Sequence, residues 1–213
     1  MEMLIKLLSV LPLAECDSTS AIRSLAALLP HGDHTGEALG MAVTDEISGS
    51  TSVAFTLFKL DEKGKVRKSL VEEYVIEENE AAGEYTMKLY LKATNWSDGT
   101  AVSANDIVFA WKRLLEVDVN YEAAALLFDI KNARAAKEGD ASIDDVGIYP
   151  AEQQMLEINF EGKIDYDQFM LNLTSLALAP LRDDIVSKSD DWAKKPGTMV
   201  CSGPFKLGRV NVK

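Results

Sequence analysis

The sequence predicts a mixed α/β fold, and three neighbouring patterns between residues 85 and 115 indicate it. Residues 85–91 alternate apolar with polar side chains, the two-residue period of a strand that buries one face. A Ser-Asp-Gly-Thr turn at residues 97–100 follows, where glycine accepts a positive φ and aspartate bonds to the backbone ahead of it. Apolar residues then recur with helical spacing as far as Leu115, so we expect strand, turn and helix in direct succession.

The first stretch of the chain, up to Cys16, is apolar enough to suggest a signal peptide or a lipoprotein anchor. Both fit poorly, because Glu2 precedes the apolar run, Lys6 interrupts it and Glu15 stands where a lipoprotein signal has a small residue. We expect a remnant of such a segment or a folded, strand-like start. A lipid-anchored Cys16 in the intact protein stays an alternative.

Residues 17–30 predict a short helix that ends at Pro30. The stretch after it contains His31, Asp33 and His34, whose side chains are of metal-binding types. The glycines around them favour a loop that would not hold a fixed coordination geometry. We therefore expect no metal site and no cofactor.

Charge and composition exclude several classes of function. The 213 residues carry a formal net charge of −12, whereas a nucleic-acid surface requires clustered Lys and Arg. The basic run at residues 63–68 contains Gly64 and follows Asp61, so it predicts a solvated hairpin tip. Two cysteines, Cys16 and Cys201, are too few for a disulfide framework. No apolar segment reaches the ~18 residues that a membrane helix needs.

The helix of the opening pattern has a defined start. Ser103 stands three residues before Asp106, the spacing of a capping box, in which the hydroxyl meets a backbone amide and the carboxylate favours the positive helix end. The helix should therefore begin near Ala104. The apolar residues that share one face and are expected to be buried are Ile107, Val108, Trp111, Leu114 and Leu115.

Downstream segments alternate between helix and strand. Residues 121–136 are alanine-rich and predict a helix, residues 137–145 predict a charged surface connection, and residues 155–161 restore the alternation of a strand. An amphipathic helix follows, and residues 176–181 predict a buried crossing. The side chains that these segments are expected to bury are Leu127, Phe128, Ile130, Leu156, Ile158, Phe160, Tyr166, Phe169, Met170 and Leu173.

The order of these motifs resembles that of the family-5 extracellular solute-binding proteins, the oligopeptide-binding type that serves ABC importers. Members carry a Tyr-Thr strand, then Trp-Ser-Asp-Gly-Thr, then Ala-x-Asp and an aromatic-x-Trp-x-Arg-Leu helix, and residues 85–114 contain counterparts of all four. The hairpin at residues 57–65 and Gly-Pro-Phe-Lys-Leu at residues 203–207 match two further landmarks. The likeness runs in order and spacing over residues 53–207.

The resemblance implies a fold similar to class II periplasmic binding proteins, with mixed α/β sheets, present here in part. Residues 1–55 would begin the first lobe with a divergent N-terminus, residues 56–180 would form a small accessory α/β lobe, and residues 181–213 would return into the first lobe. The chain is less than half the usual family length. We therefore expect the opposite lobe to be missing and this portion to bind ligand poorly by itself.

By resemblance, the intact protein captures oligopeptides or a related small solute in the periplasm or extracellular space and delivers them to ABC permease subunits. In this family two lobes close on an extended peptide, whose main chain is held by hydrogen bonds. One ligand-side residue is a Tyr shortly after the Trp-x-Arg-Leu helix, and Tyr121 fits it by spacing, although its neighbours differ from the family's Ser-Pro-Tyr-Ala. Trp96 and Trp111 are expected in the core. We expect a monomer.

Two other classes of function are less well supported. An enzyme would need a nucleophile and a base, and Cys201 with His31 or His34 is a conceivable pair that nothing in the sequence marks. The acidic pairs at residues 144–145 and 183–184 are sequence neighbours that diverge, so they predict helix starts rather than acid/base chemistry. We expect no enzymatic activity. A sensor or regulator that borrowed the solute-binding fold is the remaining alternative.

Overall fold

The computed structural model describes residues 54–119, 122–188, 192 and 200–203, together with the backbone of residues 5–12 and 205–212. Contacts divide the chain into two compact units. The first unit comprises Met1–Ala54, Asn95–Thr100 and Arg182–Lys213, and the second comprises Phe55–Thr94 and Ala101–Leu181. The lobe boundaries expected from the sequence stay a prediction. Cys16 and the helix predicted at residues 17–30 lie outside the described residues.

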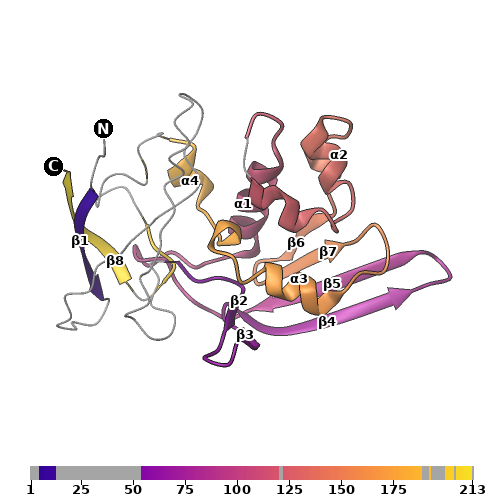
Figure 1. Ribbon diagram of the computed structural model, residues 1–213, viewed down its shortest axis with the longest axis horizontal. Coiled ribbons are helices and arrows are strands. Elements are labelled where there is room, and N and C mark those ends of the chain that lie inside the picture. Colours follow the sequence, from indigo (N-terminus) through magenta and orange to yellow (C-terminus); the bar gives the residue numbers. More distant parts are fainter. Residues whose placement is uncertain are drawn as a thin grey trace. The chain divides into compact units, whose positions relative to one another are not determined.

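A four-stranded antiparallel sheet forms the centre of the second unit (Figure 1). Its strands lie in the order β4, β5, β7, β6, so β4 and β6 are the two edges. The bounds of these strands, in that order, are Val71–Asn79, Glu84–Leu91, Met155–Asn159 and Ile148–Glu152. The strands predicted around residues 85–91 and 155–161 are the two central ones.

One face of this sheet is buried and the other is open to solvent. Met87 and Leu89 of β5 and Leu156 and Ile158 of β7 are 0% exposed, whereas Tyr90 is 37% exposed. Burial thus follows the two-residue period along both central strands. The alternation predicted for β5 and β7 is confirmed.

Helix α1, Ala104–Leu115, packs against β6 and β7. Its start is as predicted, because the Asp106 carboxylate accepts hydrogen bonds from the Ser103 backbone N–H at 2.8 Å and from the Ser103 hydroxyl at 3.2 Å. Val108 is only half-buried. The other residues of the predicted apolar face are all 0% exposed, namely Ile107, Trp111, Leu114 and Leu115.

A small hairpin precedes the sheet in the second unit. Strands β2, Phe58–Leu60, and β3, Val66–Lys68, pair antiparallel. The Asp61 carboxylate accepts the backbone N–H groups of Lys63 and Lys65, both at 2.9 Å, and so closes the turn. The predicted solvated hairpin tip is confirmed.

The helix predicted over residues 121–136 is wrong in its extent. The chain forms a 3₁₀ helix, η1, at Glu122–Leu127 and a separate helix, α2, at Ala133–Glu138, which also takes in the start of the predicted surface connection. Between them Ile130 makes a β-bridge to Phe160, and Asn132 has a φ of 60°. A left-handed residue and a backbone committed to strand pairing cannot continue a helix.

The remaining elements follow the predicted order. In the second unit, helix α3, Tyr166–Asn172, places Phe169 edge-on to Phe160 with ring centroids 5.1 Å apart. The turn η3, Leu176–Leu178, begins the predicted crossing, which is buried from Leu178 onward, whereas Leu176 is 38% exposed. A second 3₁₀ turn, η2, lies at Ile143–Asp145.

In the first unit, helix α4 spans Asp183–Val186. Strand β1, Ile5–Pro12, pairs antiparallel with β8, Phe205–Val212, which fits the expectation of a strand-like start.

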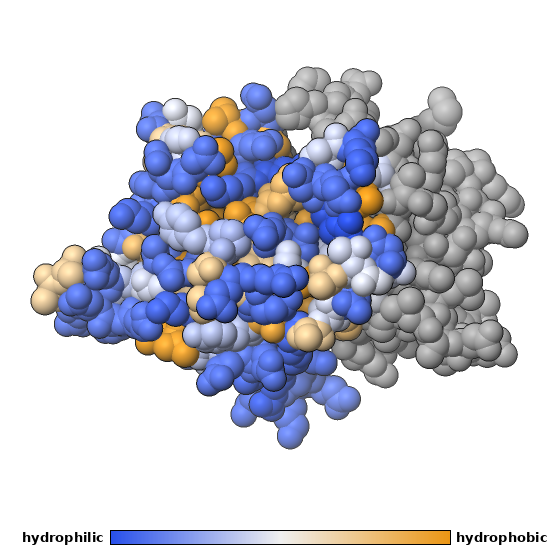
Figure 2. All heavy atoms as spheres, turned by 180° about the vertical axis from the view of Figure 1, so that it is seen from behind, coloured by the Kyte–Doolittle hydropathy of each residue, from blue (hydrophilic) through white to orange (hydrophobic). Residues whose placement is uncertain are grey.

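Polar residues cover most of one face of the described part of the chain. Figure 2 shows mainly hydrophilic residues on the face seen from behind, with hydrophobic ones scattered between them. Such a surface is expected of a chain with a net charge of −12. Among the described residues, the helices are all too short or too polar to span a bilayer.

Gly147 lies where three stretches of backbone meet. Its N–H donates to the Lys131 carbonyl at 2.9 Å, and its carbonyl accepts the Asn159 N–H at 2.8 Å. A Cβ atom at this position would lie 2.6 Å from the Asn159 carbonyl oxygen and 3.0 Å from the Lys131 Cβ. Because the closest of these atoms is backbone, no side-chain movement relieves the clash.

We expect Gly147→Ala to lower the free energy of unfolding by about 2 kcal/mol, since overpacking forces the backbone apart. Urea unfolding followed by circular dichroism measures it. Gly162→Ala is the matched control, because a Cβ there meets no atom within 4 Å. Equal stability of the Gly147→Ala variant and wild type would contradict the close backbone contact described at Gly147.

Candidate functional site

The predicted ligand contact, Tyr121, lies outside the described residues, which stop at Val119 and resume at Glu122. Its role therefore stays a prediction. His31 and His34, the bases of the enzymatic hypothesis, also lie outside the described part of the chain.

The two tryptophans of the recognition motif are core residues, as predicted. Trp96, in the first unit, is 4% exposed, and Trp111, in the second, is 0% exposed. The Trp111 indole N–H donates to the Leu178 carbonyl at 2.9 Å. Neither ring offers a face to a bound ligand, because both are buried.

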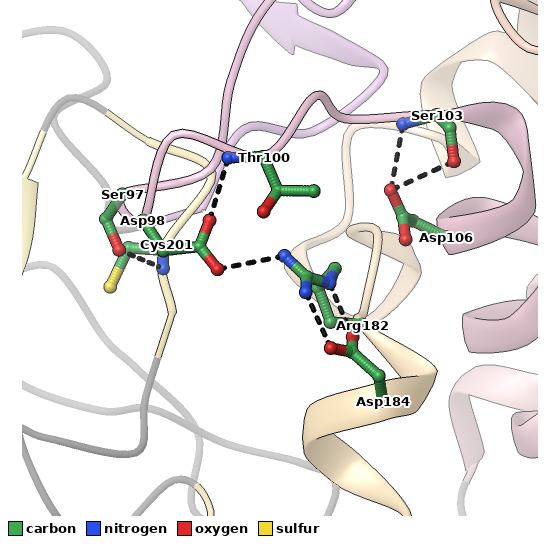
Figure 3. Close-up of polar contacts among 8 residues, drawn as sticks. All are labelled: Ser97, Asp98, Thr100, Ser103, Asp106, Arg182, Asp184 and Cys201. Carbon is green, nitrogen blue, oxygen red and sulfur yellow. Dashed lines mark hydrogen bonds and ion pairs between the residues drawn. The ribbon is translucent and has the colours of Figure 1, made fainter.

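Cys201 is held in a structural role within the first unit (Figure 3). It is 1% exposed, its N–H donates to the Ser97 hydroxyl at 3.1 Å and its carbonyl accepts the Ser97 N–H at 2.8 Å. A reactive thiolate needs solvent access and a positive neighbourhood. These two hydrogen bonds, one to the Ser97 hydroxyl and one from the Ser97 N–H, instead tie Cys201 to the Ser-Asp-Gly-Thr turn.

Arg182 links the same turn to helix α4, and sequence reasoning missed it (Figure 3). Its Nε and Nη2 donate to the two carboxylate oxygens of Asp184 at 2.6 and 2.7 Å, a bidentate pair. Its Nη1 donates to Asp98 at 3.1 Å, while the other Asp98 oxygen accepts the Thr100 N–H at 3.0 Å. One guanidinium therefore joins two segments that lie 84 residues apart in sequence.

The electrostatics of this cluster keep all three groups charged. Burial alone would raise the pKa of Asp98, but hydrogen bonds from Thr100 and the charge of Arg182 outweigh it and lower that pKa. Hydrogen bonds from Arg182 lower the pKa of Asp184, and the same bonds raise the pKa of Arg182. The arrangement can hold a turn in place, and it contains neither a nucleophile nor a base with a pKa near neutrality.

The acidic pairs begin helical turns, as the sequence predicted. Asp183 and Asp184 form the first turn of α4, and Asp144 and Asp145 lie in η2, where the Ser142 hydroxyl accepts the Asp144 N–H at 3.3 Å. Within the part of the chain that the structure describes, no group of three or more His, Cys, Asp or Glu side chains is close enough to hold a metal ion.

We expect Arg182→Met to lower the free energy of unfolding by about 1 kcal/mol, because both ion pairs are lost. The estimate is small since the Asp98 and Asp184 side chains are 37% and 50% exposed and solvent screens them. Urea unfolding at neutral pH measures the loss. The control is Arg67→Met, which removes an arginine that is 58% exposed. An equal loss in both variants would contradict the role given to Arg182.

The destabilisation by Arg182→Met should also depend on pH. A carboxylate with a lowered pKa in the folded protein adds stability above its unfolded pKa, near 3.8, and loses it as the pH falls through the folded pKa. The difference between wild type and variant should therefore be constant from neutral pH to about pH 5 and shrink below it. Urea unfolding at a series of pH values checks this, and a difference that grows in acid would refute it.

Comparison with known proteins gives related sequences. Residues 65–213 match the profile of the bacterial extracellular solute-binding proteins, family 5 Middle. The dipeptide-binding protein DppE of Bacillus subtilis (strain 168) is 25% identical over 151 residues, which are 71% of this chain and 27% of that protein. The oligopeptide-binding protein OppA of the same organism is 32% identical over 114 residues, 53% of this chain and 20% of that protein.

Solved structures agree with the predicted class of fold, a mixed α/β fold of the periplasmic-binding-protein type. The substrate-binding domain of an oligopeptide ABC transporter from Bacillus anthracis str. Ames has a TM-score of 0.67 and 28% identity, and covers 78% of this chain and 33% of that chain. OppA of Burkholderia pseudomallei has a TM-score of 0.66 and 26% identity, and covers 76% and 31%. The chain thus spans a third or less of the length of these relatives. Because the profile matches well over half of the chain, the protein belongs to the bacterial extracellular solute-binding proteins of family 5.

Proposed function

We propose that the intact protein is the substrate-binding component of an ABC importer and captures oligopeptides or a related small solute. The observation that carries the proposal is the family match over residues 65–213, together with relatives named for dipeptide and oligopeptide binding. The fold shared with the substrate-binding domain of an oligopeptide ABC transporter supports it. We infer no enzymatic activity.

In such a receptor, the described residues would serve mainly as structural scaffold and would contribute few ligand contacts. Its tryptophans, Trp96, Trp111 and Trp192, are 4%, 0% and 7% exposed, so they are structural. We propose that residues 56–180 form the accessory lobe and that Tyr121 contributes one ligand contact from it. Peptide backbone hydrogen bonds and closure of two lobes would complete the site. Because the chain spans a third or less of its relatives, we expect it to bind peptide poorly by itself.

The proposal includes a location and partners. The receptor would work in the periplasm or extracellular space, as a monomer, and would hand its ligand to ABC permease subunits. A lipid anchor at Cys16 is the alternative to a freely diffusing receptor. The chain's net charge of −12 is compatible with a well-solvated carrier.

We expect a defined library of synthetic short peptides to raise the melting temperature of the full-length gene product. A ligand present at about 100 times its Kd stabilises the folded state by about 2.7 kcal/mol. Differential scanning fluorimetry measures the shift. The 213-residue chain tested in parallel should shift little. Absence of any shift in the full-length product across the whole library would count against a peptide receptor.

We expect Tyr121→Ala to weaken binding of the most stabilising peptide about tenfold, the effect of losing about 1.4 kcal/mol of contact. Isothermal titration calorimetry on the full-length product measures this. Tyr149→Ala is the matched control, because Tyr149 is a surface tyrosine on β6 that is 40% exposed. An unchanged Kd in the Tyr121→Ala variant would remove this residue from the site.

A further inference from the structure

The hairpin of β2 and β3 concentrates positive charge on an otherwise acidic chain. Residues 59–68 hold five cationic side chains and two carboxylates, a net charge of +3, so the rest of the chain carries −15. A positive patch on a negative protein is a binding surface for anions. The five cations, all of them exposed, are Lys59, Lys63, Lys65, Arg67 and Lys68.

The Asp61 carboxylate is used within the hairpin itself. One of its oxygens accepts the backbone N–H groups of Lys63 and Lys65, and the other accepts Arg67 Nε at 2.8 Å. Within the described part of the chain, none of the four hairpin lysines forms an ion pair. Four ammonium groups are therefore available to an anionic partner.

The base of the hairpin is fixed, whereas its turn is exposed. Phe58, the first residue of β2, is 1% exposed, stands edge-on to Tyr74 with ring centroids 6.1 Å apart and donates its N–H to the Leu173 carbonyl at 3.4 Å. After β3, the Ser69 N–H donates to the Leu57 carbonyl at 3.0 Å. In Figure 1 the turn between β2 and β3 lies at the lower margin of the second unit. The lysines thus stand on an element that is firmly attached to its unit.

The types of side chain on the hairpin favour lipid headgroups over a carboxylate patch on another protein. Lysine ends in a compact ammonium on a flexible stem, which suits mobile phosphate groups, whereas the planar fork of arginine suits fixed bidentate pairing. Arg67, the arginine of the hairpin, is already paired with Asp61. Leu60 lies among the lysines and is 48% exposed, and apolar side chains beside basic ones are typical of elements that lie at a membrane interface.

We propose that the hairpin of β2 and β3 binds anionic lipid headgroups and is the element through which the protein contacts a membrane surface. Each lysine beside an anionic surface strengthens binding about fivefold, so four lysines give weak binding with a Kd of about 1 mM. The charge of −15 on the rest of the chain opposes wider contact. Salt limits that repulsion to charges within about 8 Å of the surface. Contact is therefore confined to the hairpin.

Co-sedimentation of the full-length gene product with lipid vesicles tests the proposal. Every form of the protein carries Cys16→Ser, so that no acyl chain at the alternative anchor contributes. Vesicles of phosphatidylglycerol and phosphatidylcholine in equal parts should sediment the protein, whereas vesicles of phosphatidylcholine alone should not. Raising the salt from about 0.1 M to about 1 M should release the protein, because the screening length falls from about 10 Å to about 3 Å. Absence of binding to the anionic vesicles overturns the proposal.

The variant with Lys59→Gln, Lys63→Gln and Lys65→Gln should bind about a hundredfold more weakly, at about fivefold for each lysine, and so no longer sediment. Circular dichroism checks that it folds, which is expected because these side chains are exposed. Sedimentation equal to that of wild type overturns the proposal.

The matched control removes the same charge from exposed lysines outside the hairpin and should bind as wild type does. It carries Lys131→Gln, Lys163→Gln and Lys188→Gln. Equal loss of binding in the control and in the hairpin variant would trace binding to net charge and overturn the role of the hairpin.

An acidic surface on a partner protein is the other anion that the hairpin could meet. Vesicles of phosphatidylcholine that contain the permease subunits distinguish it from lipid. Binding to these vesicles, without binding to the protein-free anionic ones, overturns the lipid proposal in favour of a protein surface. The inference goes beyond peptide capture, and the two are tested separately, because sedimentation uses no peptide and the thermal shift uses no vesicles.

Discussion

Trp111 is completely buried in the second unit, and its indole N–H therefore needs an acceptor inside the core. The Leu178 carbonyl supplies it, which fixes the return segment after α3 against α1. The Leu181 N–H, bonded to the Asp106 carbonyl at 3.0 Å, adds a second tie at the start of the same helix. These two hydrogen bonds hold the crossing at residues 178–181 against helix α1 within an apolar core.

How much of this could be predicted depends on how far apart the interacting residues are in sequence. The strand β5, the turn at Gly99 with a φ of 89°, and the capping box of Ser103 and Asp106 were predictable, because each is decided by residues within a few positions. The break at Asn132 was not. Its cause is a bridge from Ile130 to Phe160, and no local propensity reports a partner 30 residues away in sequence.

The same contrast between local and distant contacts decides which parts of the candidate site could be predicted. An arginine followed by two aspartates gives a signal for the Arg182–Asp184 pair, but nothing local links Arg182 to Asp98. Outside that site, Lys137 gave a weaker signal still, because its ammonium donates to the main-chain carbonyls of Leu114 and Glu116, and every residue carries a carbonyl. Family resemblance identified the kind of protein from motifs that the structure shows to be turn and core. The residues that would determine ligand specificity give no such signal, because their identity depends on the ligand and not on the requirements of the fold.

Both edge strands of the four-stranded sheet disfavour pairing with a further strand, for different chemical reasons. Edge strand β6 includes Pro150, which has no N–H to offer, and its pairing with β7 is irregular beside that residue. Edge strand β4 carries the exposed glutamates Glu72, Glu73, Glu77 and Glu78. A second sheet approaching either edge would meet a missing donor or a row of like charges. Both edges of this sheet are thereby protected against strand addition from another chain.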